Sequence, residues 1–314
     1  MDAPRAIAAA DPAFRDDVLA GLSAPIPAIP ARWLYDRRGS ELFEAITELP
    51  EYYPTRTERA LLERSCPEVA RIAGTGGVVV EFGSGSSTKT PILLGCARPS
   101  AYVPIDISGE FLRDSAASLQ RDFADLPIYP VEADFMQPIT LPAEVDGTAK
   151  LGFFPGSTIG NLVPRTAVDL LRAMKDTLGD GAWLLIGMDR IKDTAVLIRA
   201  YDDEAGVTAE FNLNLLHRIN SELGGNIPVD AFRHRAIWND RMSRIEMHLE
   251  AVRDVEFMIA GHAFSFARGE TIHTENSHKY GFRDARLLLR AAGWGVVEEW
   301  TDADEQFVLI LAEA

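Results

Sequence analysis

The residues with the clearest chemical potential follow three short apolar segments in the first half of the chain. Segment 78–82 is rich in valine and leads directly into Gly83-Ser84-Gly85. Glycines at such a turn let the backbone pass close to a ligand, which the N-terminus of the following helix then faces. Asp106 ends the second segment, where a carboxylate can bind ribose hydroxyls, and Asp134-Phe135 ends the third with an acceptor and an aromatic edge for a purine. The pattern predicts a nucleoside-binding site.

Two cofactor chemistries compete for this site. A dinucleotide-binding loop has a third glycine three residues after the second, but Thr88 occupies that position, which disfavours a nicotinamide oxidoreductase. S-adenosylmethionine has no phosphate and needs no such loop. The ordered set of Glu81-Phe82-Gly83-x-Gly85, Asp106 and Asp134-Phe135, followed by a C-terminal hairpin, resembles the class I methyltransferases. The resemblance implies S-adenosylmethionine as co-substrate.

A polar loop follows the fourth apolar segment. Residues 156–161 come after segment 151–154, and open α/β sheets place reacting groups beyond the carboxyl ends of their strands. Asn161 suits the orientation of an amine nucleophile because its amide both donates and accepts hydrogen bonds. The alternative is a plain connecting loop that ends before Pro164.

The elements that must position these residues alternate between strands and helices, which predicts an α/β fold with a parallel, doubly wound, Rossmann-like sheet. The expected strands are 78–82, 101–105, 128–131, 151–154 and 182–188, with a helix at 283–292 and a closing hairpin of strands 295–300 and 306–312. A helical block at 194–223 and sheet-forming segments at 232–236, 244–251 and 256–266 interrupt this pattern, and so long an insertion predicts a second, α+β domain. We therefore expect a cofactor-binding methyltransferase domain of residues 60–194 and 282–314, and a substrate-binding domain of residues 1–59 and 195–281.

Composition excludes several classes of protein. The chain has 314 residues, of which 47% are hydrophobic, and a formal net charge of -16, which disfavours nucleic acid as a partner. Its apolar runs are far shorter than the roughly 20 residues of a membrane helix, and residues 1–14 show no signal peptide. We expect a cytoplasmic monomer in which Cys66 and Cys96 are reduced, structural thiols. The six histidines show no metal-ligand spacing, so no metal is expected.

A set of motifs, in unchanged order from about residue 32 to the end, resembles the histidine-specific Nα-methyltransferases of ergothioneine biosynthesis. The motifs are Tyr35-Asp36, Gly39-Ser40, Leu42-Phe43 and residues 49–56, 81–85, 156–162, 192–194, 199–203, 244–247 and 272–277. The resemblance implies a Rossmann-like domain with a substrate-binding domain. It also implies trimethylation of the α-amino group of L-histidine to hercynine, with three molecules of S-adenosylmethionine.

Matching motif positions give the implied roles of individual residues. The cofactor residues are Gly83, Ser84, Gly85, Lys89, Asp106, Asp134 and Phe135; the residues around the amine and carboxylate are Tyr52, Gly156, Asn161 and Tyr201, with Tyr35 close by; Glu275 and Ser277 recognise the imidazole and Met247 lines its pocket. Of these, Asn161, Tyr35 and Tyr52 are the catalytic candidates. Asn276, His278 and Tyr280 lie in a tail that varies in the family, which puts fine substrate tuning in question.

Two further alternatives stay open. A methyltransferase of the same family could act on another amino acid such as tryptophan, although an indole has one donor and no second polar nitrogen to pair with Glu275 and Ser277. A non-catalytic protein that only binds S-adenosylmethionine would be expected to lose Asn161 or the tyrosines, which are present.

Overall fold

The computed structural model describes residues 11–85 and 88–314, and the chain divides into two compact units. Unit 1 contains the residues up to Tyr52 together with Thr194–Arg241 and Ile245–Asn276; unit 2 contains Tyr53–Asp193, Met242–Arg244 and Ser277–Ala314. The chain first passes from unit 1 to unit 2 after Tyr52, earlier than the expected boundary at residue 60. The reason is that the long helix α3 (Tyr53–Ala73) packs on the sheet of unit 2. The start of the expected N-terminal segment, residues 1–10, lies outside the described residues.

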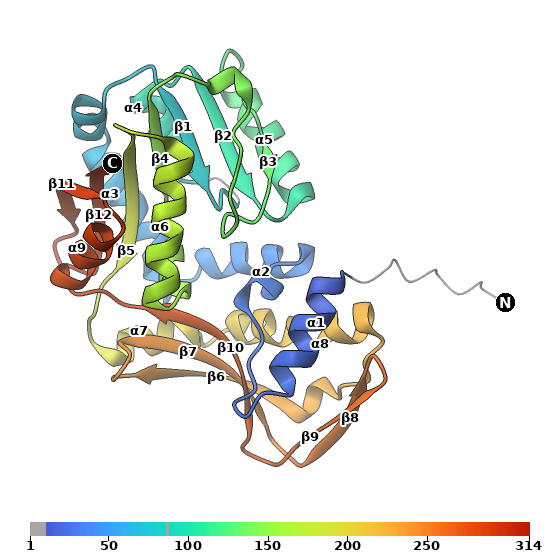
Figure 1. The fold of residues 1–314 in the computed structure, drawn as a ribbon. Coiled ribbons are helices and arrows are strands. Elements are labelled where there is room, and N and C mark those ends of the chain that lie inside the picture. Colours follow the sequence, from blue (N-terminus) through green and yellow to red (C-terminus); the bar gives the residue numbers. More distant parts are fainter. Residues whose placement is uncertain (1–10, 86–87) are drawn as a thin grey trace. The chain divides into compact units, whose positions relative to one another are not determined.

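Unit 2 is built on a mixed seven-stranded sheet with the order β11-β12-β5-β4-β1-β2-β3 (Figure 1). The strands are β1 (Val78–Phe82), β2 (Ala101–Asp106), β3 (Val131–Glu132), β4 (Lys150–Phe154), β5 (Trp183–Asp189), β11 (Gly295–Thr301) and β12 (Phe307–Glu313). Strands β1 to β5 are parallel, whereas β12 is antiparallel to both β5 and β11. The expected α/β fold with a closing antiparallel hairpin is confirmed.

Alternation along the central strands creates two hydrophobic cores, one on each face of this sheet. Val78 and Val80 of β1 face α6 (Pro164–Leu178) and α9 (Phe282–Ala291). Val79 faces the opposite core, which contains side chains of α3, α4 (Thr90–Ala97) and α5 (Gly109–Asp122). Because neighbouring strand residues point to opposite faces, a strand covered on both sides is apolar throughout. This explains the uninterrupted run of valines.

Unit 1 combines helices with two small sheets. Its helical elements are α1 (Pro12–Leu22), α2 (Arg37–Thr47), α7 (Thr194–Tyr201) and α8 (Val207–Leu223), with short 3-10 turns η1 (Ala31–Leu34) and η4 (Val229–Ala231). A three-stranded sheet has the order β10-β7-β6, with β6 (Phe232–Asn239), β7 (Arg244–Ala251) and β10 (Thr271–His278); β8 (Val255–Ile259) and β9 (His262–Phe266) form a separate hairpin. Helix α8 packs on α2 and on β6, so it forms the centre of the unit.

The sequence analysis missed or simplified some of these elements. The expected helical block 194–223 is two helices, separated at residues 202–206, and the expected sheet-forming segment 256–266 is a hairpin of two strands. Strand β10 was recognised only as a motif, because its polar residues Thr274, Asn276 and Ser277 hide the strand pattern. No helix among the described residues is long and apolar enough to cross a membrane.

The expectation of two reduced thiols is wrong. Cys66 of α3 and Cys96 of α4 form a disulfide, with their Cα atoms 6.0 Å apart. The two helices pack against each other and bring the cysteines to the separation that a disulfide requires. Their distance along the chain gave no indication of this contact.

Candidate active site

The turn after β1 is shaped by glycines with a left-handed backbone. Gly83 has φ 72° and Gly85 has φ 46°, a region that residues with a Cβ rarely adopt. The amide of Gly83 donates to the carbonyl of Ile105 in β2 at 2.8 Å. A Cβ built on Gly83 would lie 3.4 Å from Cε1 of Phe135, so the ring borders the turn directly. The turn and Phe135 therefore lie together beyond the carboxyl end of β1.

The Asp106 carboxylate holds this turn in place at the end of β2. Its Oδ2 accepts from the amide of Gly85 at 3.0 Å, and its Oδ1 accepts from the amide of Ser108 at 2.9 Å. A carboxylate oxygen has two acceptor sites, so each can still accept a hydroxyl of a ligand. Asp134 caps its own turn in the same way, through the amide of Met136 at 2.9 Å. These residues fit the recognition of a nucleoside.

Lys89 has a protein partner that the sequence analysis did not foresee. Its Nζ forms an ion pair with Oε2 of Glu58, which is fully buried in α3. The same oxygen accepts the amide of Gly156 at 2.8 Å. Glu58 therefore ties the segment before α4 to the loop after β4. Lys89, assigned to the cofactor by resemblance, also serves this internal contact.

The loop with Asn161 is a short 3-10 turn, η3 (Thr158–Asn161), held by residues at and just after the end of β10. Nδ1 of His278 lies 2.9 Å from the carbonyl oxygen of Gly160, and the hydroxyl of Tyr280 donates to the carbonyl of Ile159 at 3.3 Å. A Cβ on Gly160 would lie 2.8 Å from the carbonyl oxygen of His278, so only glycine allows this approach. His278 and Tyr280 thus support the loop, a role that goes beyond substrate tuning.

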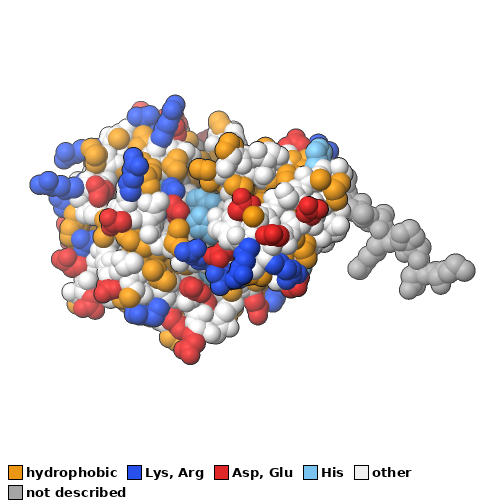
Figure 2. Space-filling model, turned by 90° about the horizontal axis from the view of Figure 1, so that it is seen from below, with side chains coloured by type: hydrophobic (Ala, Val, Ile, Leu, Met, Phe, Trp, Pro, Cys, Tyr) orange, Lys and Arg blue, Asp and Glu red, His pale blue; other side chains and the backbone are white. Residues whose placement is uncertain are grey.

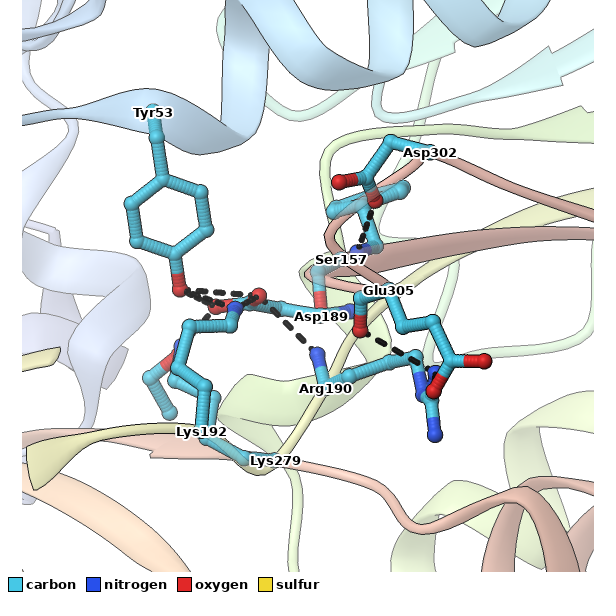
Figure 3. Close-up of polar contacts among 10 residues, drawn as sticks. Tyr53, Ser157, Asp189, Arg190, Lys192, Lys279, Asp302 and Glu305 are labelled. Carbon is cyan, nitrogen blue, oxygen red and sulfur yellow. Dashed lines mark hydrogen bonds and ion pairs between the residues drawn. The ribbon is translucent and has the colours of Figure 1, made fainter. Parts of the chain in front are cut away.

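A buried ionic cluster surrounds Asp189 at the end of β5 (Figure 3). Oδ2 of Asp189 lies 2.7 Å from Nζ of Lys279, and Oδ1 pairs with Nζ of Lys192. The Tyr53 hydroxyl donates to the same carboxylate at 2.7 Å. Burial alone would raise the pKa of Asp189, but Lys279 and Lys192 outweigh it and hold that pKa below its ordinary value. Burial lowers the pKa of Lys192 to about 8, against the opposing effect of Asp189.

This cluster fixes two of the serines near the predicted site. The Ser277 hydroxyl oxygen accepts from Nζ of Lys279 at 2.8 Å, and the Ser157 hydroxyl oxygen accepts the amide of Asp189 at 2.9 Å. Ser157 is the residue before η3 and has φ 56°, so its side chain anchors a left-handed turn. Sequence reasoning missed both Asp189 and Lys279. An acid at the end of the fifth strand was the available signal, because this is where such sheets place functional groups.

Unit 1 brings together most of the remaining predicted residues. The hydroxyl of Tyr35 donates to Oε1 of Glu275 at 3.3 Å. The rings of Tyr52 and Tyr201 meet edge to face with centroids 6.1 Å apart, and Phe43 contacts the rings of both Tyr35 and Tyr52. Burial, followed by the charge of Glu275, raises the pKa of Tyr35 well above its ordinary value. The group is a buried carboxylate beside a set of aromatic rings.

Met247 lies in β7, next to the strand that carries Glu275. It is buried, and its carbonyl accepts from the hydroxyl of Thr274 at 3.1 Å. The predicted residues Gly156, Asn161 and Ser277 belong to unit 2, as do all the residues predicted for the cofactor. Within each unit the structure brings residues from distant parts of the sequence to neighbouring positions.

Comparisons with known proteins agree on one family. Residues 14–314 match the model of a family described as histidine-specific, S-adenosylmethionine-dependent methyltransferases. A histidine N-alpha-methyltransferase of Mycolicibacterium smegmatis is 41% identical over 96% of this chain and 94% of its own length. An L-tryptophan methyltransferase of Psilocybe serbica is 25% identical over 96% of this chain and 93% of its own length. In fold, the chain is similar to an S-adenosylmethionine-dependent methyltransferase of Clostridium acetobutylicum, with a TM-score of 0.52, 12% identity, and coverage of 87% of this chain and 98% of that one.

Proposed function

The chain belongs to the family of histidine-specific, S-adenosylmethionine-dependent methyltransferases, and we propose that it trimethylates the α-amino group of L-histidine to hercynine, a step of ergothioneine biosynthesis. The observation that carries the choice of substrate is the buried carboxylate of Glu275, which lies among aromatic rings and receives a hydrogen bond from Tyr35. A carboxylate accepts several hydrogen bonds, so an imidazole N–H of the ligand can donate to Glu275 beside Tyr35.

The residues beyond the carboxyl ends of β1, β2 and β3 fit S-adenosylmethionine. A Cβ at Gly85 would meet no atom of the described residues within 4 Å, its chain neighbours aside, so among them the turn borders open space. Asp106 would accept the ribose hydroxyls, and Asp134 and Phe135 would serve the adenine. The co-substrate supplies an electrophilic methyl group on a positively charged sulfur. Gly83, Ser84 and Lys89 complete the set of residues that we assign to it.

We assign recognition of the imidazole to Glu275 and Ser277. Glu275 would accept from one ring nitrogen, and the Ser277 hydroxyl, held by Lys279, would serve the other. An amino acid without two polar ring nitrogens cannot hydrogen-bond to both groups, and sites built to hydrogen-bond a polar substrate strongly reject analogues that lack the polar group. Met247 would line the side-chain pocket, and Gly156, Asn161, Tyr52 and Tyr201 are assigned to the amine and the carboxylate.

The chemistry requires a neutral amine and a site without bulk water. Methyl transfer is an in-line displacement, so catalysis consists mainly of orientation. The raised pKa of Tyr35 keeps its hydroxyl protonated at neutral pH, so Tyr35 acts as a hydrogen-bond donor and not as a base. Asn161, Tyr52 or water would accept or relay the proton of the amine. The aromatic faces around Tyr52 and Tyr201 would also tolerate the final quaternary cation.

Mass spectrometry of L-histidine incubated with the protein and S-adenosylmethionine tests the proposal. We expect products with one, two and three added methyl groups, and fragmentation should place all of them on the α-nitrogen. Methyl groups on the imidazole would contradict the proposed orientation. Tryptophan in the same assay distinguishes the alternative substrate, and it should react poorly because its indole offers Glu275 and Ser277 only one polar group.

The proposed partners are small molecules only, and we propose a monomer in the cytoplasm. The negative net charge of -16 supports the absence of nucleic acid from this set. The Cys66–Cys96 disulfide weighs against the cytoplasm, where thiols are usually kept reduced. Alkylation of thiols in intact cells before lysis decides between the compartments, because two free cysteines would be labelled in a reducing one.

A further inference from the structure

We propose that Glu246, His248 and His273 form a binding site for one divalent metal ion of the zinc class. All three belong to unit 1, and the ligand atoms that they offer lie within 4.8 Å of one another. Glu246 and His248 are two residues apart in β7, so their side chains share a face of the sheet. His273 lies in β10, which is next to β7. The spacing of histidines in the sequence gave no indication of this site, because its ligands come from two strands.

The distance between two of the three ligands suits a tetrahedral ion. Nε2 of His248 and Oε2 of Glu246 are 3.2 Å apart. Two ligands bound to zinc at about 2.0–2.1 Å lie about 3.3 Å apart in a tetrahedron. The rings of His248 and His273 stack with centroids 4.8 Å apart and an interplanar angle of 19°, so one ring would turn about its side-chain bonds to direct both lone pairs at one ion. Two imidazoles and one carboxylate, with a fourth position for water, form a familiar zinc ligand set.

Outer contacts orient two of the three ligands. Nε2 of His273 lies 3.0 Å from the carbonyl oxygen of Glu275, which can only accept, so Nε2 carries a proton and Nδ1 is the nitrogen that would bind the ion. Metal-binding histidines usually donate their second nitrogen in this way. Oε1 of Glu246, the oxygen that does not face His248, accepts a hydrogen bond from the side-chain amide of Asn239 at 2.8 Å.

The backbone of His273 is held on both sides. Its amide donates to the carbonyl of Pro27 at 2.9 Å, and its carbonyl accepts the amide of Ile29 at 2.9 Å. Strand β10 is therefore fixed between β7 and the segment with Pro27 and Ile29. A ligand set on a fixed backbone loses less conformational entropy when an ion binds.

An ion can reach the triad from solvent. The side chains of His248 and Glu246 are 13% and 10% exposed, so a small part of the triad reaches solvent. Figure 2 shows histidine side chains on one face of the molecule, without naming them. On the β6–β7 part of the sheet, Arg233 and Arg235 of β6 both pair with Glu250 of β7, which offsets part of their positive charge.

The site is separate from the groups that we assign to the substrate. The backbone carbonyl of Glu275 contacts His273, whereas its side chain accepts a hydrogen bond from Tyr35. A bound ion would therefore stabilise β10 at Glu275 without taking part in methyl transfer. The inference does not depend on the identity of the substrate.

The test uses the full chain after treatment with a chelator and titrates it with Co²⁺, whose visible spectrum reports tetrahedral coordination. We expect one Co²⁺ per chain, its displacement by Zn²⁺, and a rise in melting temperature with Zn²⁺ because the ion binds only the folded state. Glu246→Gln and His273→Asn should each weaken Co²⁺ binding by more than about 100-fold, beyond the usual effect of outer partners.

His262→Asn is the matched control, because this histidine is exposed in the β8–β9 hairpin. It should leave Co²⁺ binding and the effect of Zn²⁺ on the melting temperature unchanged. Melting temperatures without metal show whether the triad variants are folded. Absence of stoichiometric binding to the unmodified chain would overturn the proposal, as would equal affinity in the His262 and His273 variants.

Discussion

At the scale of single residues, the proposed function depends most on Glu275. Its carboxylate is 8% exposed and receives a hydrogen bond from Tyr35, which has a raised pKa and stays protonated. The carboxylate therefore faces a donor in the protein and, in our proposal, a second donor in the ligand. Removal of the carboxylate should affect histidine selectivity more than the fold.

Glu275→Ala should lower kcat/KM for histidine by about 30-fold or more, which corresponds to about 2 kcal/mol for an unpaired imidazole donor. Phenylalanine and tryptophan should gain relative to histidine, because the variant no longer buries a charge that they cannot pair. Kinetics with the three amino acids, together with thermal melts without ligand, provide the measurement. Tyr35→Phe is the control that removes only the protein donor. Unchanged kinetics and an unchanged order of preference would reduce Glu275 to a structural carboxylate.

Asp106→Ala should weaken binding of S-adenosylmethionine by roughly 1.5 to 3 kcal/mol, the range for charge-assisted hydrogen bonds. Part of the loss would come from the turn itself, since Asp106 also accepts the amides of Gly85 and Ser108. Asp106→Asn keeps one acceptor oxygen, so its affinity for S-adenosylmethionine should lie between those of the unmodified protein and Asp106→Ala. Isothermal titration calorimetry measures the three affinities. Equal affinities would show that the cofactor does not contact this carboxylate.

At the scale of elements, strand β1 carries a buried acid in its core. Glu81 accepts hydrogen bonds from Tyr102 and Thr90 on one oxygen, at 2.6 Å and 2.7 Å. Burial nevertheless raises its pKa to about 7, from an ordinary value of 4.5. Between these values the folded chain binds more protons than the unfolded chain, so the free energy of unfolding falls as the pH rises from 4.5 to 7.

Glu81→Gln should remove this pH dependence. The shift corresponds to about 3 kcal/mol, so the variant should gain up to that amount relative to the unmodified protein between pH 4.5 and pH 8. Urea unfolding at both pH values measures the change. Glu63→Gln is the control, since the Glu63 side chain is 53% exposed. A stability difference that is independent of pH would show that Glu81 has the same pKa in the folded and unfolded states.

The disulfide between α3 and α4 gives a second prediction for the elements. It closes a loop of 30 residues, and the chain-entropy model assigns about 3 to 4 kcal/mol to such a link. Reduction, or Cys96→Ser, should therefore lower the melting temperature, and reduction should have no further effect on the variant. Two alkylatable thiols in the denatured, unreduced protein would contradict the disulfide.

The elements of unit 2 were predictable because their signals are local. The apolar run 78–82 became β1 with the expected bounds, and the glycines and acids at strand ends followed from the rules for parallel sheets. Contacts between distant segments were not predictable. Glu58 meets Lys89, Cys66 meets Cys96, and Lys279 meets Asp189 only after the elements that carry or flank them have packed. Strand β10 was missed for a related reason, since its burial depends on its neighbours and not on its own composition.

At the scale of the whole molecule, β12 connects the two hydrophobic cores of unit 2. It lies between β5 and β11, and residues 307–312 are all buried. Leu309 faces the core with α3 and α4, whereas Ile310 faces the core with α6 and α9. The last strand of the chain thus completes a sheet whose other central strands come from the first two thirds of the sequence.

Leu309→Ala and Ile310→Ala should each lower the free energy of unfolding by about 2 to 5 kcal/mol, because each removes a buried side chain and leaves a cavity. The two residues are adjacent in sequence but share no core, so the double variant should show the sum of the two losses, within about 0.5 kcal/mol. Urea unfolding followed by circular dichroism measures all three variants. Val297→Ala, at an exposed position of β11 that is 45% accessible, is the control and should change stability by less than about 0.5 kcal/mol. An interaction energy well above that value would mean that the sheet transmits packing changes from one core to the other, and that unit 2 has a single coupled core.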